Sequence, residues 1–589
     1  MGIGFTLDSP IRLAPLGIDS AISLVSDSVI ETARALHSKK RLLPYVAIED
    51  GAPDARARRI TEYLDLVDKL VAQDIEKLRA SSFEDEKGIS RYFNLLPETS
   101  ALRQQFLTTE KMEPGSDKEA ARDQLRQQIR RGTIDVNIMT KVDSSKDAKG
   151  QPRGKHNSVA QEALRGFALS TVEGAMIFSA GANPGLFAYL ADFDDFFPDK
   201  DQKTKKRLIL KVSDFRSAHV QGRMLARRGL WVSEYRIESG LNCGGHAFPT
   251  EGLLMGPILK EFADRRDELE GGLFKAYQKG LVKRGLPEPE EAPPVKITAQ
   301  GGVGTHREHE FLMDEYNLDG IGWGSPFLMV PEAVSLDSRT FENLAKATPE
   351  EISLSWSSPL GVRFWWLTSC GSEEKRVERI EEGFPGSVCT DRHLALNEEY
   401  GNVPLCTGSR AYQKRKKAEL DPNAPDYDIV MKRLESPACI CVDLCGSFLS
   451  HANENDAPPA AICPGPNIVN FQKEITLEEM VDHIYGRTDI ITRSDRPHLF
   501  AREIELYFQV FEEDLGLLGT SLAGRTPVQL TNTLKNLETG FDYYEQLFSR
   551  LPESERSELE SSLRTLREQR DSWDLRLAER LSKIEREAS

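Results

Sequence analysis

Short apolar runs alternate with amphipathic helical patterns between residues 133 and 328. The apolar runs predict six strands, at 133–141, 173–181, 207–214, 229–240, 294–302 and 318–328. The segments between them repeat apolar residues at helical spacing, as in SVAQEALRGFALS (158–170) and HREHEFLMDEY (306–316). Strands that alternate with helices in this way predict a parallel sheet with crossover helices.

Two further strands are predicted near the N-terminus, at PIRLAPLG (10–17) and SAISLVSD (20–27), followed by a helix at 28–38. The count then reaches eight. Eight parallel strands predict an α/β fold of the (β/α)8 TIM barrel type over residues 1–345, with an open doubly wound sheet as the alternative.

Three regions of the chain do not follow this alternation of strands and helices. Residues 41 to about 130 predict a helical insertion, because Ile60, Leu64, Val67, Val71, Ile75 and Leu78 recur at spacings of three and four. Residues 346–475 hold seven of the eight cysteines and predict an irregular additional module. Residues 476–589 predict a helical C-terminal region, whose last apolar stripe favours docking on its own chain over a dimerising coiled coil.

Composition and charge narrow the function classes. Among 589 residues, 93 acidic and 76 basic side chains give a net charge of −17, which disfavours nucleic acid and anionic membranes as partners. No apolar stretch approaches the roughly 20 residues needed to span a bilayer, and the N-terminus has no signal-peptide pattern. Eight cysteines are too sparse for a disulfide scaffold, so we expect a cytoplasmic protein that acts on a small-molecule substrate. A homo-oligomer is compatible with this composition.

Glycines cluster where the last two predicted strands end, in AQGGVGTH (299–306) and GWGSPF (322–327). Small residues let backbone N–H groups approach an anion, and the loops after strands seven and eight of a barrel commonly bind phosphate. The candidate phosphate ligands are Gly301, Gly302, Gly304, Gly324 and Ser325. The alternative is that these glycines only form tight turns.

A third glycine pair, Gly244-Gly245, precedes His246 after the predicted sixth strand. This position predicts an exposed imidazole at the same barrel mouth. Its ordinary pKa near neutrality suits a general acid or base, or a hydrogen bond to an anionic intermediate. A structural histidine is the alternative.

Together these segments resemble the nitronate monooxygenase family (2-nitropropane dioxygenase-like), which is similar to flavin-dependent enoyl-acyl-carrier-protein reductases. The resemblance rests on Ala14-Pro15-Leu16-Gly17 as an early strand end, on Gly244-Gly245-His246, and on GGVGTHREHEFLMDEYNLDGIGWGSPFLMVPEA from residue 301. It covers about half the chain, roughly residues 1–40 and 130–335.

The resemblance implies an FMN-dependent oxidoreductase. It places the FMN phosphate on loops 301–304 and 324–325, and the isoalloxazine ring near Ala14, Pro15, Leu16 and Gly17. Asn137 matches a family asparagine near the flavin, and His246 matches the family's base or substrate-orienting histidine. Lys141, at the end of a predicted strand, is a second catalytic candidate that would stabilise reduced flavin or a substrate anion, or else a solvated lysine.

Three functions stay open. The first is a monooxygenase that acts on nitronates or a similar small activated substrate. The second is an NAD(P)H-dependent reductase of an enoyl thioester. The third is a non-catalytic flavoprotein or assembly subunit, in which the additional module binds a partner.

The cysteine run CICVDLC predicts either a buried strand face of small thiols or a metal site. The candidate ligands of zinc or an iron–sulfur cluster are Cys439, Cys441, Cys445 and Cys463. Alternate side chains of a straight strand lie about 6.6 Å apart, so one metal reaches all of them only if the strand bends. Redox-active thiols are a further alternative.

Overall fold

The computed structural model describes residues 4–139, 143–147, 149–179, 181–247, 251–452, 457–551 and 553–588. Seven parallel strands form one sheet in the order β1 to β7. They are β1 (Ser20–Ser23), β2 (Ile134–Ile138), β3 (Gly174–Phe178), β4 (Lys206–Val212), β5 (Val232–Glu238), β6 (Lys296–Gln300) and β7 (Gly320–Gly322). The sheet curls into a half-barrel.

The predicted α/β fold with parallel strands is therefore confirmed, whereas a closed eight-stranded barrel is not. The predicted strand at 10–17 is wrong, because this segment forms helix α1 (Ser9–Leu13) and the 3-10 turn η1 (Ala14–Leu16). Pro10 and Pro15 lie in the first positions of these helical turns, where a missing N–H costs nothing, and neither proline could donate to a strand ladder. Within the described residues, β1 and β7 are the two edges of the sheet.

Helices connect successive strands. The long β1–β2 connection holds α2 (Asp27–Lys40), α3 (Ala55–Ala80), α4 (Ile89–Asn94), α5 (Ala101–Glu110) and α6 (Ser116–Gln128). The later connections hold α7 (Val159–Leu169), α8 (Pro184–Leu190) with η2 (Asp194–Phe196), α9 (Phe215–Ala226), α10 (Met255–Asp264), α11 (Arg266–Lys283) and α12 (His306–Tyr316).

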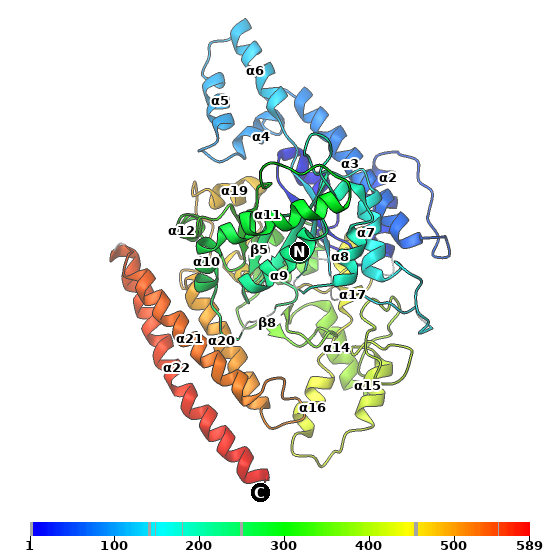
Figure 1. Cartoon of the computed structure of the whole chain (residues 1–589), viewed down its shortest axis with the longest axis vertical. Coiled ribbons are helices and arrows are strands. Elements are labelled where there is room, and N and C mark those ends of the chain that lie inside the picture. Colours follow the sequence, from blue (N-terminus) through cyan, green and yellow to red (C-terminus); the bar gives the residue numbers. More distant parts are fainter. Residues whose placement is uncertain are drawn as a thin grey trace.

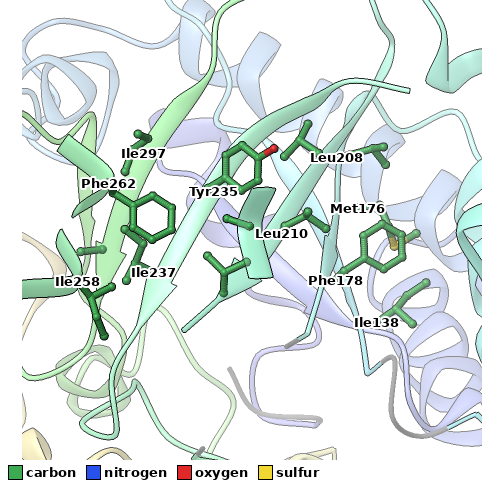
Figure 2. Packing of buried hydrophobic residues seen from close by; sticks show 14 of the residues in the cluster. Ile138, Met176, Phe178, Leu208, Leu210, Tyr235, Ile237, Ile258, Phe262 and Ile297 are labelled. Atoms are coloured by element: carbon green, nitrogen blue, oxygen red, sulfur yellow. The ribbon is translucent and has the colours of Figure 1, made fainter. Parts of the chain in front are cut away.

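The convex face of the sheet carries the main core. Alternate strand residues such as Phe178, Leu210 and Ile237 are buried against the covering helices, to which α10 contributes Ile258 and Phe262 (Figure 2). The intervening residues of the same strands point into the half-barrel, and many of them are polar or charged. The strands thus place apolar side chains outward and a largely polar set inward.

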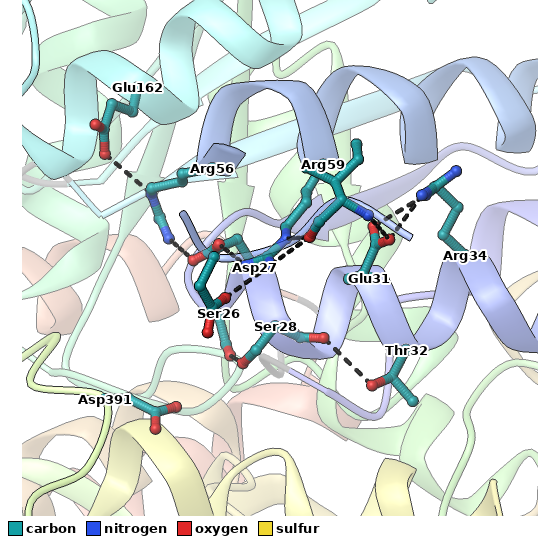
Figure 3. A network of polar contacts seen from close by, with 12 residues as sticks. Ser26, Asp27, Ser28, Glu31, Thr32, Arg34, Arg56, Arg59, Glu162 and Asp391 are labelled. Atoms are coloured by element: carbon teal, nitrogen blue, oxygen red, sulfur yellow. Dashed lines mark hydrogen bonds and ion pairs between the residues drawn. The ribbon is translucent and has the colours of Figure 1, made fainter. Parts of the chain in front are cut away.

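The inserted helices dock through α3. Its Arg56 and Arg59 guanidinium groups contact the two Asp27 carboxylate oxygens at the start of α2, at 2.7 and 3.0 Å (Figure 3). Helices α4, α5 and α6 form a separate small core with the end of α3, which includes Phe83, Phe93 and Phe106. Figure 1 shows α5 and α6 at one end of the molecule's long axis and the end of α22 at the other.

The chain beyond β7 builds a second core around Trp365 and Trp366. Its elements are η3 (Ser325–Met329), α13 (Ser338–Lys346), the antiparallel hairpin β8 (Ile352–Ser355) and β9 (Phe364–Leu367), α14 (Gly371–Glu381), α15 (Arg410–Lys417), α16 (Tyr427–Leu434), α17 (Ile440–Asp443), α18 (Gly446–His451), η4 (Pro466–Asn470) and α19 (Leu477–Ile484).

Three long helices follow, α20 (Leu499–Leu517), α21 (Pro527–Phe548) and α22 (Glu553–Ala588). Helix α22 lies along α21 and α20 (Figure 1). Its Trp573 is buried against Phe508 and Phe511, with ring centroids 6.1 and 5.0 Å away. The predicted docking of this tail on its own chain is confirmed. No helix in the described part of the chain combines the length and apolar character needed to cross a membrane.

Candidate functional site

A cavity of about 540 Å³ occupies the concave side of the sheet and extends to the carboxyl ends of the strands. Its size is typical of a site for a small molecule or cofactor. Most of its lining comes from inward strand residues, the loops after β5 and β7, and the region after residue 327, and the N-terminal residues Phe5 and Thr6 also contribute. The lining includes Asn137, Lys211, Glu238, Gly244, Gly245, His246, Gly322, Trp323, Gly324, Phe364, Leu394, Ile440 and Cys441.

The loop after β5 is held by the region beyond β7. Gly244 and Gly245 have φ angles of 111° and 77°, which glycine adopts without strain. A Cβ on Gly244 would lie 2.1 Å from the Cys463 carbonyl oxygen, and the Gly245 N–H donates to that oxygen at 3.1 Å. The Trp365 N–H in turn donates to the Gly245 carbonyl at 3.0 Å. These contacts fix the loop at the cavity wall.

His246 follows directly and forms part of that wall. Its Nε2 lies 2.7 Å from the Ser358 hydroxyl oxygen, and its ring packs edge-on against Phe364 at a centroid distance of 4.8 Å. The Ser358 oxygen also accepts the Leu360 N–H at 3.2 Å, which holds the hydroxyl group in place beside the imidazole. The Asn242 amide donates to the His246 carbonyl at 2.6 Å. The imidazole is therefore held in one orientation beside the cavity.

The sequence does not predict Ser358. It lies 112 positions after His246 and carries no motif. Only the fold of the β8–β9 hairpin, whose loop contains it, brings it to the histidine.

The loop after β7 forms another part of the rim, through Gly322, Trp323 and Gly324. A Cβ on Gly324 would lie 2.3 Å from the Cys243 Cβ, so only glycine lets the two loops approach this closely. The Trp323 indole N–H donates to His309 Nδ1 at 2.9 Å. Burial lowers the pKa of His309, which keeps its ring neutral and able to accept that bond. In the sequence, only the position of Trp323 between two glycines indicates that its side chain has a special role in this loop.

Asn137 lies on β2 inside the cavity, as its predicted role near a cofactor requires. Its amide nitrogen is 3.5 Å from the Ser23 hydroxyl, a weak contact. Its carbonyl oxygen is buried and has no hydrogen-bond partner among the described residues. A buried acceptor without a partner is costly, and here it faces a cavity that a ligand with an N–H or O–H group could fill.

Charged side chains form the floor of the cavity, and the sequence analysis missed them. Lys211 contacts Glu238 at 3.1 Å, and Arg236 contacts Glu234 at 2.8 Å. Asp135 is buried beside them, and this burial raises its pKa to about 6. The signal was the alternation of charged and apolar residues within the strands, as in WVSEYRIE, which marks a polar inner face.

The loop predicted to bind phosphate bonds to a carboxylate of helix α12 instead. The buried Glu308 accepts the Gly304 N–H at 2.9 Å and the Leu499 N–H at 2.9 Å, and pairs with the Arg496 guanidinium at 2.7 Å. Burial raises the pKa of Glu308, but Arg496 outweighs this and lowers it overall, so the group is ionised. Glu308 thus satisfies the Gly304 N–H that a phosphate would need.

The other predicted phosphate ligands divide between two environments. Gly301 and Gly302 pack against Leu241, and neither they nor Gly304 belongs to the cavity lining. The Ser325 hydroxyl is 3.2 Å from the Cys243 carbonyl and accepts the Gly465 N–H at 2.8 Å, so it joins protein segments. Gly324 alone of this group reaches the cavity.

The predicted flavin-ring segment 14–17 lies at the other end of the sheet. It precedes β1, and the Ala14 carbonyl accepts the Gly132 N–H, just before β2, at 2.8 Å. Gly17 faces the Tyr92 ring. Ala14, Pro15, Leu16 and Gly17 are therefore at the amino ends of the strands, whereas His246 follows the carboxyl end of β5. Lys141 lies outside the described residues.

The four cysteines predicted as a metal group are buried, but they do not lie on a strand. Cys439 precedes the short helix α17, which contains Cys441, and the Cys445 thiol points at the Cys441 carbonyl, 3.7 Å away. Cys463 lies beside Gly244. The predicted strand face is wrong, and no group of three or more histidine, cysteine or acidic residues in the described ranges is arranged to hold a metal ion.

Comparisons with known proteins do not assign this chain to a family. No protein-family model matches the chain, and no curated protein matches it. Among solved structures, the chain is similar to FabK from Thermotoga maritima, at 12% sequence identity and a TM-score of 0.33, over 68% of this chain and 86% of that one.

Proposed function

We propose that this chain is a flavin-dependent oxidoreductase whose reaction takes place in the cavity at the carboxyl ends of the strands. The observation that carries the proposal is the convergence of three features on one cavity: the Gly244-Gly245 and Gly322–Gly324 rims, the oriented imidazole of His246, and the unpartnered Asn137 oxygen. Ligand sites of α/β sheets lie at this edge.

The cavity fits the ring system of a flavin, whereas the loop predicted to bind the flavin phosphate is a poor phosphate site. The glycines of the rims, Gly244, Gly245 and Gly324, let a flat ring lie against the backbone, and Asn137 offers an acceptor to a ring N–H. The Gly304 N–H, by contrast, is already bonded to Glu308. We therefore assign only the ring to named residues, namely Asn137, Gly244, Gly245 and Gly324, and we assign no phosphate to the 301–304 loop.

When bound, a flavin supplies the electron transfer, and the protein supplies placement and proton handling. The hydrogen bond between the Ser358 hydroxyl and His246 Nε2 directs the imidazole. His246 would then give or take a proton at a substrate atom in the cavity, a role typically worth 10²- to 10⁴-fold in rate. Phe364 packs edge-on against the imidazole and covers one side of it.

The outer wall of the cavity favours a substrate with an apolar part. Leu360, Leu394, Ile440 and Leu444 all line it from the region after β7. A small nitronate would leave this wall unfilled, whereas an activated alkene on an acyl chain would cover it. Among the candidate reactions, the reduction of an enoyl thioester with NAD(P)H is thus better supported than nitronate oxygenation.

The two reactions separate in one assay. Purified full-length protein supplied with FMN is incubated without oxygen with NADPH and a short-chain enoyl thioester, and absorbance at 340 nm is followed. Substrate-dependent NADPH oxidation supports the reductase, and nitronate-dependent oxygen uptake without NADPH supports the oxygenase. Flavin binding without either activity would favour a non-catalytic flavoprotein.

A further inference from the structure

A groove of about 590 Å³ runs between helices α9 and α11. The two helices pack side by side (Figure 1) and run in the same direction, since Gly222 approaches Leu273 and, further along both segments, Gly229 approaches Gly280. Both helices cover the convex face of the sheet, so the groove is separate from the cavity that contains His246. It is lined by His219, Arg223, Arg227, Gly272, Leu273, Lys275, Ala276, Lys279 and Lys283.

Five permanent cations line this groove. Arg223 and Arg227 lie on one side of it, and Lys275, Lys279 and Lys283 lie on the other. Each set recurs at every fourth residue, which places its members on one face of the helix. All five side chains are exposed, and none of them pairs with a carboxylate in the part of the chain that the structure describes. The described lining of the groove contains no acidic residue.

Basic residues of the same region that lie outside the groove do have acidic partners. Arg265 pairs with Glu268 at 2.8 Å, and Arg266 pairs with Glu270 at 2.8 Å. Acidic residues outnumber basic ones in the whole chain, 93 to 76, so carboxylates are abundant. The groove is therefore a positively charged surface on a negatively charged protein.

This arrangement of like charges does not stabilise the two helices. Cations four residues apart on one helix, such as Lys275 and Lys279, repel each other. The helix dipole favours a cation in the last turn, where Arg223 and Lys283 lie, but its effect does not reach Lys275 and Lys279. An anionic partner in the groove would remove the repulsion.

We propose that this groove binds an acidic helix of a partner protein. The lysine side extends about 12 Å along the groove, from Lys275 to Lys283, which matches more than two turns of a third helix. Gly272 and Ala276 keep the floor low, so an apolar ridge of that helix can approach Leu273. Carboxylates on both flanks of the ridge would then meet the cations on the two sides.

The same features favour a helix over a phosphorylated small molecule. The N–H groups within α9 and α11 are already bonded inside these helices, so the floor offers no backbone donors to a phosphate. The cations are exposed, which suits a broad charged interface that steers a partner. This surface does not depend on the flavin proposal.

The test uses the full-length protein and a fluorescent, lactam-stapled helical peptide of about 18 residues. The peptide carries glutamates on both flanks of an alanine–leucine stripe, and fluorescence anisotropy follows its binding. We expect saturable binding to the wild type, and at least tenfold weaker binding to Lys279→Glu, because an attraction becomes a repulsion. Lys414→Glu on α15 is the matched control, since Lys414 is also exposed and lies in a basic run, and it should bind within twofold of the wild type.

Two further measurements separate charge recognition from a change in folding. Lys279→Gln, which only removes the charge, should weaken binding by about threefold. An increase in ionic strength from about 0.01 to 0.1 M shortens the Debye length from about 30 to 10 Å and should weaken binding to the wild type at least tenfold.

Four results would each overturn the proposal. They are the absence of peptide binding to the wild type, equal binding of a peptide with glutamines in place of the glutamates, equal losses in Lys279→Glu and Lys414→Glu, and displacement of the labelled peptide by tripolyphosphate at a lower concentration than by the unlabelled peptide. The last result would identify the groove as a polyphosphate site.

Discussion

His246 Nε2 and the Ser358 hydroxyl oxygen lie 2.7 Å apart, although the two residues are 112 positions apart in the sequence. The histidine belongs to the loop after β5, and the serine to the hairpin loop between β8 and β9. The region after β7 thus does more than cover the half-barrel: it supplies the group that orients the candidate catalytic imidazole.

This relationship predicts a graded loss of activity. We expect His246→Ala to lower kcat by about 10²- to 10⁴-fold. Ser358→Ala removes a single hydrogen bond, so we expect a loss of about tenfold. Ser357→Ala, next in the chain and bonded to Ser355 instead, is the control and should leave kcat within twofold. The measurement is steady-state NADPH oxidation, and an unchanged rate in both His246 and Ser358 variants would contradict the assigned roles.

The Glu308–Arg496 pair predicts a cost in stability. Both side chains are almost fully buried, and removing one partner leaves the other charge uncompensated. We expect Arg496→Met to lower the free energy of unfolding by about 3–5 kcal/mol, as measured by urea denaturation. Glu310→Gln, an exposed carboxylate two residues further along α12, should change it by less than about 0.5 kcal/mol. A small effect of Arg496→Met would mean that the loop does not rely on this pair.

Glu503 predicts a pH dependence of stability. Burial raises its pKa to about 8, well above the value of an unfolded glutamate, so the folded state binds the extra proton. Its contribution to stability is intact below about pH 4.5 and is lost as the pH rises toward 8.

Replacing Glu503 by Gln removes this titration. We expect Glu503→Gln to flatten the decline in unfolding free energy between pH 5 and 8, relative to the wild type, by roughly 4 kcal/mol at most. Glu505→Gln, a more exposed carboxylate on the same helix, should keep the wild-type slope. Urea denaturation at four pH values measures the unfolding free energy of each variant. Parallel curves of unfolding free energy against pH for the wild type and Glu503→Gln would refute the pKa assignment.

Gly244 predicts a local steric requirement. Its φ of 111° is unfavourable for alanine, and an added Cβ would lie 2.1 Å from the Cys463 carbonyl oxygen. Gly285 also has a positive φ, of 75°, but open space around it. We expect Gly244→Ala to destabilise the protein by more than Gly285→Ala, whose cost is about 1 kcal/mol, and to abolish flavin binding. Thermal unfolding and flavin titration of the two variants measure this, and equal behaviour would contradict the packing described for the loop.

The sequence predicts those strands and helices whose apolar residues recur at regular spacing within a short stretch of chain. The short apolar runs TIDVNIM and WVSEYRIE predict strands, which the structure confirms as β2 and β5, whereas Asn137 was expected near a cofactor only from the family resemblance. The segment PIRLAPLG has the same apolar content as a strand, yet its prolines favour helical turns, so the eighth strand was wrong. The carboxylate of α12 that bonds to the glycine loop was not predictable, because the Arg496 that pairs with Glu308 lies 188 positions away.

Titration of the full-length protein with FMN, followed by quenching of flavin fluorescence, tests the central assignment most directly. We predict saturable binding of one flavin per chain, weakened at least tenfold by Asn137→Leu, which removes the unpartnered acceptor, and unchanged by Asn157→Leu on the exposed surface. Absence of binding to the wild type, or equal affinity of the wild type and Asn137→Leu, would contradict a flavin in this cavity.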